Sequence, residues 1–455
     1  MSIIESSQKR PRILVVGGGY VGLYVAKNLQ KKVKARGGIV TVVDPNPYMT
    51  YQPFLPEVAG GQIEPRHVVV SHRQHLKHSE LVNGKVVGVD HAKKTATIEP
   101  VNGESFELEY TDIVMAAGAV TRTFPITGLA EAGIGLKTIE EAVALRNKVA
   151  ERIESASNMT DEAARKRALT FVVVGGGFAG IETISELEDM ARHLVKLNDR
   201  VKLEELRFVL VEAMGRIMPE VTAEQAEWVV EHLRSRGIEV LLNTSLNSAV
   251  DGNLELINMA DKSPAGEFGA DTLIWCAGVM ANPMVRATDF NIEARGRIET
   301  RTDLRIKDAN GDAVDGAWAA GDISAVTDVT GGLPDGTCVP NAQHAVRQAK
   351  LLAKNLYAVR YGVGSVKEYK HKNLGAVAGF GRNKGVAKVM GIKLKGWPAW
   401  MAHRGYHGMA MPMFERKFRV LGDWMVAFFF NRDAVQLNNL EAPRTAFEES
   451  AKPKK

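Results

Sequence analysis

The chain has 455 residues, of which 45% are hydrophobic and 24% are charged, and its net charge is +5 at pH 7. This is the composition of a folded globular protein and excludes a disordered chain, while the length predicts two or three domains. A charge of +5 on so long a chain does not by itself indicate nucleic-acid binding.

Cysteine content and hydropathy further limit the class of protein to which the chain can belong. Only Cys276 and Cys338 occur, far apart, so the sequence has no disulfide framework and no C-x-x-C pair for redox chemistry or zinc. This pattern predicts a reducing compartment. The chain starts without the apolar core of a signal peptide, and no apolar run reaches the roughly 18 residues that a membrane span needs. We expect neither secretion nor a membrane span, which leaves attachment to a membrane surface open.

The first unit begins with an apolar strand that runs into glycines and then into an apolar helix, at residues 13–26. Its G-x-G-x-x-G glycines are Gly17, Gly19 and Gly22. Such a loop turns tightly at the first glycine, lets a pyrophosphate approach at the second and packs helix on strand at the third. Asp44 ends the next expected strand, where an acid binds ribose hydroxyls. The alternative is a turn acid before Pro45.

The same pattern returns at residues 171–187. Its glycines are Gly175, Gly177 and Gly180. Glu212 ends the following strand and takes the role of Asp44, which favours NADH over NADPH. The interval from glycines to acid is longer in this copy, so we expect a longer helix and connector. Two dinucleotide sites in one chain indicate transfer of reducing equivalents between two dinucleotides.

The stretches around the first loop carry further expected contacts. Residues 48–61 are aromatic and proline-rich, too irregular for a helix, and are expected to cover a bound ligand. Residues 83–100 alternate like a small antiparallel sheet, in which Val86 could offer its backbone to an adenine ring. Residues 110–122 read as a buried strand that closes at Ala117, where backbone passes close to a cofactor.

Beyond a charged helical connection at residues 138–166, the second unit closes with a strand at 270–283. A later strand delivers Gly321 and Asp322, and an acid there can bind a ribityl hydroxyl of a flavin; an Asx-turn is the alternative. A helix follows over residues 341–356, whose positive end would favour a flavin that becomes anionic on reduction.

Three side chains are candidates for the chemistry. Glu182 lies near the start of the second glycine-loop helix, where it could hydrogen-bond a nicotinamide or relay a proton; a helix-dipole acid is the alternative. Gln343 and Gln348 are amides that could bind quinone carbonyls without adding charge, although surface polar residues of a helix would have the same spacing.

For Cys338 and for the pair His403 and His407, we weigh a chemical role against a purely structural one. Cys338 lies close to the expected flavin and is either a sulfur acceptor or a buried apolar thiol, the commoner case. His403 and His407 are four residues apart but have no acidic neighbour in sequence, so we expect no metal there.

The end of the chain is basic and aromatic. Residues 381–419 hold nine Lys or Arg and one acid, with Trp and Met interleaved. Over residues 414–430, apolar side chains recur at spacings of four and three and form one face. Such an amphipathic segment suits the surface of an anionic membrane. A helical hairpin packed on the core or on a second subunit is the alternative.

The motifs GGGYVG, GGGFAGIE, WCAGV, AAGD and NAQHAVRQ, in this order, resemble the two-dinucleotide-fold flavoproteins. More narrowly they resemble type II NADH:quinone oxidoreductases, single-subunit respiratory dehydrogenases that do not pump protons. The resemblance covers essentially the whole chain. It implies FAD in the first fold on Gly17, Gly19, Gly22, Asp44 and Asp322. It implies NADH in the second fold on Gly175, Gly177, Gly180, Glu182 and Glu212.

The resemblance also implies a membrane quinone, menaquinone or ubiquinone, as acceptor, and a peripheral place on the cytoplasmic face of the cell membrane. The family's quinone motif A-Q-x-A-x-Q is matched in part. Gln343 fits, whereas Arg347 stands at the last glutamine and Gln348 follows one step late. The second amide contact and the choice of quinone therefore stay open, as does a homodimer.

Together these features predict an α/β chain with two Rossmann-like domains and a C-terminal amphipathic, membrane-binding helical segment. The expected divisions are 1–137 (FAD domain, first part), 138–166 (connecting helices), 167–290 (NADH domain), 291–380 (FAD domain, second part, with the quinone-site helix) and 381–455 (membrane anchoring or dimerisation). Two alternative functions remain. One is a sulfide:quinone oxidoreductase, for which Cys338 is the only good flavin-side cysteine; the other is a flavoprotein that senses NADH with little turnover.

Overall fold

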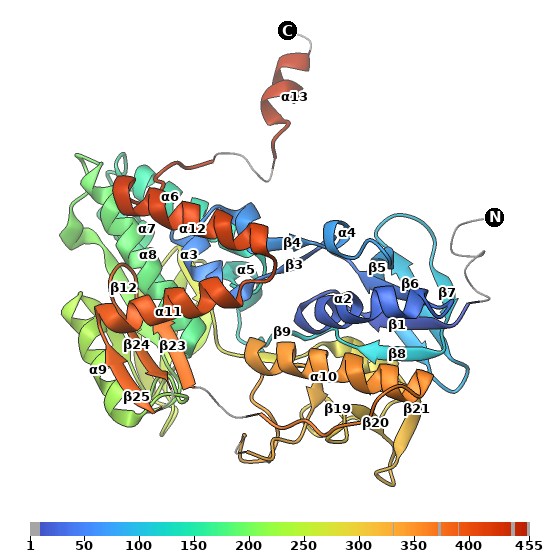
Figure 1. Cartoon of the computed structure of the whole chain (residues 1–455). Coiled ribbons are helices and arrows are strands. Elements are labelled where there is room, and N and C mark those ends of the chain that lie inside the picture. Colours follow the sequence, from blue (N-terminus) through green and yellow to red (C-terminus); the bar gives the residue numbers. More distant parts are fainter. Residues whose placement is uncertain (1–9, 331, 372–374, 390, 438–441, 453–455) are drawn as a thin grey trace. The chain divides into compact units, whose positions relative to one another are not determined.

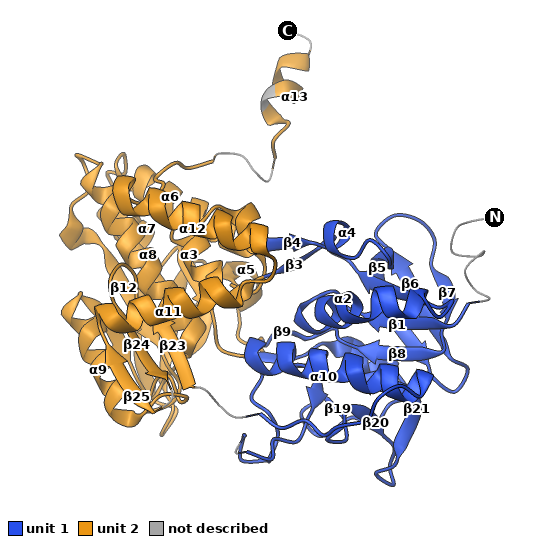
Figure 2. Ribbon diagram, viewed as in Figure 1, with its two compact units in different colours: residues 1–50, 69–122, 279–374 blue, residues 51–68, 123–278, 375–455 orange. Residues whose placement is uncertain are grey.

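The computed structural model of the chain describes residues 10–330, 332–371, 375–389, 391–437 and 442–452. The chain forms two compact units, each assembled from three stretches of sequence (Figure 2). Unit 1 takes residues 1–50, 69–122 and 279–374, and unit 2 takes residues 51–68, 123–278 and 375–455. The chain crosses between the units near residues 50, 68, 122, 278 and 374, whereas the sequence predicted divisions at 137, 166, 290 and 380.

Unit 1 is built on an eight-stranded sheet in the order β20-β21-β8-β1-β2-β5-β6-β7 (Figure 1). Its central strand β1 (Arg12–Val16) pairs in parallel with β2 (Ile39–Asp44) and β8 (Asp112–Met115). The strands β1 and β8 are buried along their whole length, as expected of parallel strands covered on both faces. The other strands are β5 (Glu80–Asp90), β6 (Thr95–Pro100), β7 (Phe106–Glu109), β20 (Arg305–Lys307) and β21 (Ala313–Ala319).

Helices α2 (Tyr20–Lys34) and α10 (Ala342–Tyr361) pack against each other in unit 1. The expected antiparallel strands of residues 83–100 are β5 and β6, which extend the main sheet. The smaller elements are β3 (Tyr48–Thr50), β4 (Val69–Ser71), α4 (His72–His75), β9 (Ala119–Thr121), β18 (Val279–Ala281), η4 (Pro283–Ala287), β19 (Ile298–Glu299) and β22 (Ser324–Ala325). The core beneath them includes Leu14, Val16, Ile98, Ile113 and Ile306.

Unit 2 contains a second sheet, in the order β10-β17-β11-β12-β13, with all its pairs parallel. The order β17-β11-β12-β13 repeats β8-β1-β2-β5 of unit 1, which confirms the two Rossmann-like folds. The strands are β10 (Gly133–Ile134), β11 (Thr170–Val174), β12 (Arg207–Val211), β13 (Ile238–Leu241) and β17 (Thr272–Trp275). A separate antiparallel sheet is formed by β14 (Thr244–Val250), β15 (Asn253–Asn258) and β16 (Pro264–Gly269).

The helices of unit 2 include α5 (Leu129–Ala132), α6 (Ile139–Ala156), α7 (Glu162–Ala168), α8 (Phe178–Lys196), η3 (Leu203–Glu205) and α9 (Ala223–Ser235). Helices α6 and α7 confirm the helical connection expected at residues 138–166. Helix α8 has 19 residues against 15 in α2. With η3 behind it, this length accounts for the longer interval between glycines and acid in the second copy.

The expectation that residues 48–61 are too irregular for a helix is wrong. They form β3, the 3-10 turn η1 (Gln52–Phe54) and helix α3 (Leu55–Ala59), followed by η2 (Pro65–Val68). Pro53 and Pro56 stand in the first turns of η1 and α3, where a proline has no hydrogen bond to lose. Phe54 and Val58 are fully buried, so the apolar content of this segment belongs to the core.

The C-terminal part begins as a sheet, not as a helical segment. Strands β23 (Gly375–Gly379), β24 (Gly385–Val389) and β25 (Ile392–Lys395) are antiparallel, and α11 (Trp397–Ala410) packs on them. Helix α12 (Phe414–Phe430) has the bounds that its apolar spacing predicted. A short helix, α13 (Thr445–Ala451), follows.

Candidate functional site

The first glycine loop joins β1 to α2, and each of its motif glycines meets a different steric demand. Gly17 has a φ of +97°, and a Cβ there would lie 2.7 Å from the Ala116 carbonyl oxygen. A Cβ at Gly22 would lie 1.8 Å from the Gly17 oxygen, so helix and strand can pack this closely only at a glycine. A Cβ at Gly19 would meet no atom within 4 Å. The middle glycine therefore faces open space, where a pyrophosphate would approach.

The second loop, between β11 and α8, has the same geometry. Gly175 has a φ of +114°, and a Cβ there would lie 2.5 Å from the Cys276 oxygen. A Cβ at Gly180 would lie 1.8 Å from the Gly175 oxygen, and one at Gly177 would meet nothing within 4 Å. Two copies of one loop geometry indicate the same ligand chemistry, a diphosphate, at both.

Helices α2 and α8 differ from α6 and α9 in how their N-termini are capped. Helices α2 and α8 begin at Gly19 and Gly177 with no side-chain cap and no acid in the first turn. In contrast, α6 and α9 have complete capping boxes based on Thr138 and Thr222. The N-terminal N–H groups and the positive ends of α2 and α8, which no side chain caps, can therefore bind an anion.

The two strand-end acids hold equivalent positions. Asp44 Oδ2 accepts a hydrogen bond from Gly18 N at 2.6 Å, and its Oδ1 accepts one from Asn46 N at 2.7 Å. Glu212 repeats this with Gly176 N at 2.5 Å and Met214 N at 2.7 Å. Burial raises the pKa of Asp44, against the opposing effect of its two backbone hydrogen bonds. Each acid is thus anchored beside its loop, where ribose hydroxyls of a bound dinucleotide belong.

The other expected flavin contacts lie on unit 1. Val86 is buried within β5 and pairs with Ile98 of β6. Ala117 is the second residue after β8, and its oxygen accepts a hydrogen bond from Asn282 Nδ2 at 3.4 Å. Gly321 and Asp322 follow β21, with Gly321 at a φ of +78°. These residues and the first glycine loop with Asp44 all belong to unit 1, the unit for which the sequence predicted FAD.

Helix α10 carries the two amides in different surroundings. Gln348 is 1% exposed, and its Oε1 accepts a hydrogen bond from Gly321 N at 2.7 Å. Gln343 is half-buried in the first turn of the helix, and its Oε1 accepts a hydrogen bond from Arg347 Nη1 at 3.2 Å. The displaced glutamine thus fixes the strand end beside Asp322, while Gln343 and Arg347 form a more accessible pair.

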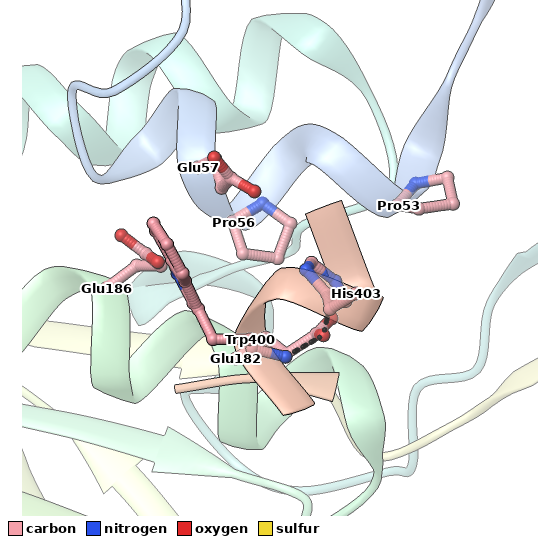
Figure 3. A pocket seen from close by; sticks show the side chains of 8 residues that line it. Pro53, Pro56, Glu57, Glu182, Glu186, Trp400 and His403 are labelled. Carbon is pink, nitrogen blue, oxygen red and sulfur yellow. Dashed lines mark hydrogen bonds and ion pairs between the residues drawn. The ribbon is translucent and has the colours of Figure 1, made fainter. Parts of the chain in front are cut away.

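Glu182 lines a small pocket in unit 2 (Figure 3). The lining residues come from η1, α3, α8, β23 and α11, and they are Pro53, Pro56, Glu57, Glu182, Glu186, Gly379, Trp400 and His403. Glu182 Oε1 accepts a hydrogen bond from Gly379 N at 3.0 Å and lies 3.2 Å from His403 Nε2. The carboxylate is therefore fixed between a backbone donor and an imidazole.

The expectation that His403 has no acidic partner is wrong, because the partner comes from another part of the chain. Burial lowers the pKa of His403, but the hydrogen bond and charge of Glu182 outweigh it and raise that pKa above the usual value. His407, one turn on, contacts the Tyr51 hydroxyl through Nδ1 at 3.0 Å. Burial, and then the charge of His403, lowers the pKa of His407. The pKa values of the two histidines are therefore shifted in opposite directions.

A buried ionic network beside this pocket was not predicted from the sequence. Arg432 donates to Glu186 at 2.6 Å and to Asp189 at 3.0 Å. Glu57 Oε2 accepts hydrogen bonds from Trp424 Nε1 at 2.7 Å and from Arg404 Nη2 at 3.3 Å. Burial raises the pKa of Glu186, an effect that Arg432 opposes. No local motif marks these residues. The only sequence signal that could have indicated them is the presence of charged side chains within otherwise apolar helices.

Helix α12 presents an apolar surface. Trp424 and Asp423 tie it to α3 and η2, since Asp423 accepts hydrogen bonds from Glu64 N and His67. Other side chains of the helix are half to three-quarters exposed: Phe414, Phe418, Leu421, Met425, Val426, Phe428, Phe429 and Phe430. We call this set the α12 apolar face. Within the described part of the chain, no helix is long and apolar enough to cross a membrane.

Two glycine loops of one geometry, each with an uncapped helix and an anchored acid, define an oxidoreductase of the two-dinucleotide class. The chain belongs to the pyridine nucleotide-disulphide oxidoreductase family, whose model matches residues 11–349. The resemblance to type II NADH:quinone oxidoreductases is also confirmed. The chain is 26% identical over 436 residues to such an enzyme of Mycobacterium tuberculosis, covering 93% of this chain and 89% of the relative.

Solved structures agree at the level of the fold. An NDH2 of Plasmodium falciparum in complex with NADH superposes with a TM-score of 0.84 at 18% identity, covering 94% of this chain and all of the other. A sulfide:quinone oxidoreductase of Aquifex aeolicus gives a TM-score of 0.69 at 16% identity, covering 93% and 96%. The fold of this chain is therefore more similar to that of the NDH2 than to that of the sulfide:quinone oxidoreductase.

Proposed function

We propose that this protein is a type II NADH:quinone oxidoreductase, which oxidises NADH through FAD and reduces a membrane quinone without pumping protons. The observation that carries the proposal is the paired set of glycine loops, each open at its middle glycine and flanked by an anchored acid. Relatives with this activity that align over most of the chain support it.

In this proposal the two loops hold different dinucleotides. Unit 1 binds FAD through the first glycine loop, Asp44, the backbone at Val86 and Ala117, and the strand end at Gly321 and Asp322. When bound, the flavin supplies the group that takes a hydride from NADH and returns two electrons to the quinone. Unit 2 binds NADH through the second glycine loop, while the Glu212 carboxylate binds the adenosine ribose and repels a 2′-phosphate.

The acceptor side is assigned to α10. Gln343 is the amide that we expect to hydrogen-bond a quinone carbonyl, because it is half-buried and near the helix start. Gln348 has its oxygen committed to Gly321 N, so it acts as a positioning residue for the flavin-binding strand end. Whether menaquinone or ubiquinone is used depends on side chains around this helix start, of which Arg347 is the departure from the family motif.

Quinone reduction consumes two protons with its two electrons, so the enzyme needs groups that hold and release protons. The pair Glu182 and His403 supports such a role, because a carboxylate and an imidazole lie 3.2 Å apart in a pocket. The Glu182 carboxylate also stabilises a protonated His403. We therefore assign Glu182 as a catalytic carboxylate and His403 as its partner in holding a proton.

Membrane attachment is assigned to the α12 apolar face. Its Phe, Leu and Met side chains would enter the acyl boundary of a bilayer, and basic residues such as Lys417 and Arg419 would meet anionic headgroups. We therefore propose a peripheral enzyme on the cytoplasmic face of the cell membrane, where NADH is available. The same face could instead bury against a second copy as a homodimer.

The test uses purified full-length protein loaded with FAD. Its absorption spectrum is recorded before and after anaerobic NADH, followed by steady-state NADH oxidation with a short-chain quinone. We expect bleaching of the flavin band and sustained turnover. Bleaching with negligible turnover would favour the NADH sensor, and faster reduction by sulfide than by NADH would favour a sulfide:quinone oxidoreductase. A protein that stays colourless after reconstitution would refute the proposal.

A further inference from the structure

A cluster of metal-ligating side chains lies in unit 1 outside both glycine loops. Asp328, Cys338 and His344 each offer one ligand atom, and these three atoms lie within 4.8 Å of one another. All three side chains are at most 8% exposed. They come from the loop after β22 and from α10, so the fold brings together residues with no metal-binding spacing in sequence.

The ligand atoms are held in place by other residues. His344 Nδ1 lies 2.8 Å from the Tyr369 hydroxyl, so a proton on Nδ1 leaves the Nε2 lone pair free on the side of Asp328, whose Oδ2 is 3.9 Å away. Asp328 Oδ1 accepts hydrogen bonds from Thr330 N at 2.9 Å and Thr330 Oγ1 at 2.7 Å. Metal-binding histidines and carboxylates are usually oriented in this way by outer partners.

A further histidine, His371, contacts one member of the cluster. The His371 ring is 4% exposed and packs edge-on against His344, with ring centroids 4.5 Å apart. The Thr330 hydroxyl lies within hydrogen-bond distance of both Asp328 Oδ1 and the His371 backbone oxygen, and it can donate its single proton to either of them. His371 or a water molecule could therefore complete a four-coordinate site.

We propose that Asp328, Cys338 and His344 form a binding site for a divalent transition metal, with zinc as the best match. Mixed oxygen, sulfur and nitrogen ligands are typical of Zn²⁺. Tetrahedral zinc holds its ligand atoms about 3.5 Å apart, so the side chains would close by roughly 1 Å. A carboxylate and a thiolate would balance the double charge of the ion in this buried place. The ion would fasten the backbone at Asp328 and Cys338 to α10.

The test uses the full-length, FAD-loaded protein, freed of metal by dialysis against a chelator. Zinc is titrated in competition with a chromogenic chelator, and bound metal is counted by mass spectrometry. We expect one zinc per chain and at least a hundredfold weaker binding in Cys338→Ser and His344→Ala. Tyr369→Phe should weaken binding about tenfold, because it removes only the orienting hydroxyl.

The matched controls are Cys276→Ser and His91→Gln. Cys276 is the other thiol of the chain, and His91 forms another buried pair with a tyrosine, Tyr110, at 3.0 Å. Both should bind zinc like the unaltered protein. Retained zinc binding in both Cys338→Ser and His344→Ala, or none in the unaltered protein, would overturn the proposal.

A cobalt titration of the unaltered protein keeps the test decisive if a variant fails to fold. Co²⁺ bound through Cys338 should give a thiolate-to-metal charge-transfer band in the difference spectrum. Binding without such a band would overturn the assignment of the thiolate. These readouts do not involve NADH or quinone, so they stand or fall separately from the proposed oxidoreductase function.

Discussion

The Gln348 side chain accepts a hydrogen bond from the Gly321 backbone N–H at 2.7 Å, which connects α10 to the end of strand β21. Gly321 adopts a left-handed conformation with a φ of +78°, and Asp322 follows it directly. The hydrogen bond therefore helps to fix the turn that presents Asp322. Gln348, which follows one step after the last glutamine position of the family's quinone motif, thus binds the turn that precedes Asp322.

Replacing Gln348 by Leu should weaken FAD binding. The substitution leaves the buried Gly321 N–H without its acceptor, a loss that typically costs about 1–3 kcal/mol. We expect FAD to dissociate roughly tenfold more readily, as measured by flavin fluorescence on dilution, and the thermal midpoint to fall. Gln343→Leu is the matched control on the same helix. It should keep its FAD and instead raise the KM for a short-chain quinone, and equal FAD loss in both variants would contradict the division of roles.

Glu212→Ala should relax the preference for NADH. The carboxylate is held beside the second loop by Gly176 N and Met214 N, where it would accept ribose hydroxyls and repel a 2′-phosphate. Loss of both effects should cut the ratio of kcat/KM for NADH over NADPH by about tenfold or more, or about 1.4 kcal/mol. Steady-state rates with both donors measure it. Glu220→Ala, an exposed acid nearby, is the control; an unchanged ratio in Glu212→Ala would remove this residue from the donor site.

The sequence predicted what depends on local pattern and missed what depends on long-range contact. The glycine loops, Asp44 and Glu212 follow from short spacings, and α12 has the bounds that its apolar period predicted. The Glu182 and His403 pair joins two distant parts of the chain, so no local motif could reveal it. Residues 48–61 were misread because proline was taken only as a helix breaker, although it suits a first helical turn.

The Glu182 and His403 pair should make stability depend on pH in a defined direction. The pKa of His403 is raised above its usual value of 6.5, because Glu182 outweighs the effect of burial. The stabilisation is then fully present below the unfolded pKa and is lost as the pH rises through the folded pKa. The groups that act on His403 also include Glu57, which raises its pKa, and Arg404, which lowers it.

Glu182→Gln should remove most of this dependence. We expect the difference in the free energy of unfolding between the unaltered protein and Glu182→Gln to be largest below about pH 6.5 and to shrink above it. Urea unfolding of the FAD-loaded proteins across pH 5.5–9 measures this. The basic limb of the quinone-reduction rate should also move to lower pH in the variant. A difference that grows with pH would contradict the pairing, and His407→Gln, which lacks a carboxylate partner, serves as the comparison.

The α12 apolar face can be tested without removing any part of the pocket. Truncation before α11 would also delete His403, so substitutions on the exposed face are the sharper choice. Phe418→Glu and Met425→Glu change side chains that are 58% and 56% exposed, and should leave folding and FAD reduction by NADH intact. Each loses burial of an apolar side chain in the bilayer, about 1.5–3 kcal/mol, so binding to anionic vesicles should fall at least tenfold.

Val250→Glu places the same charge at an exposed apolar residue of β14, outside α12, and should bind vesicles normally. Unchanged vesicle binding by both α12 variants, measured by co-sedimentation, would exclude this face as the membrane contact, and a fall in molecular mass in solution would assign it to a homodimer.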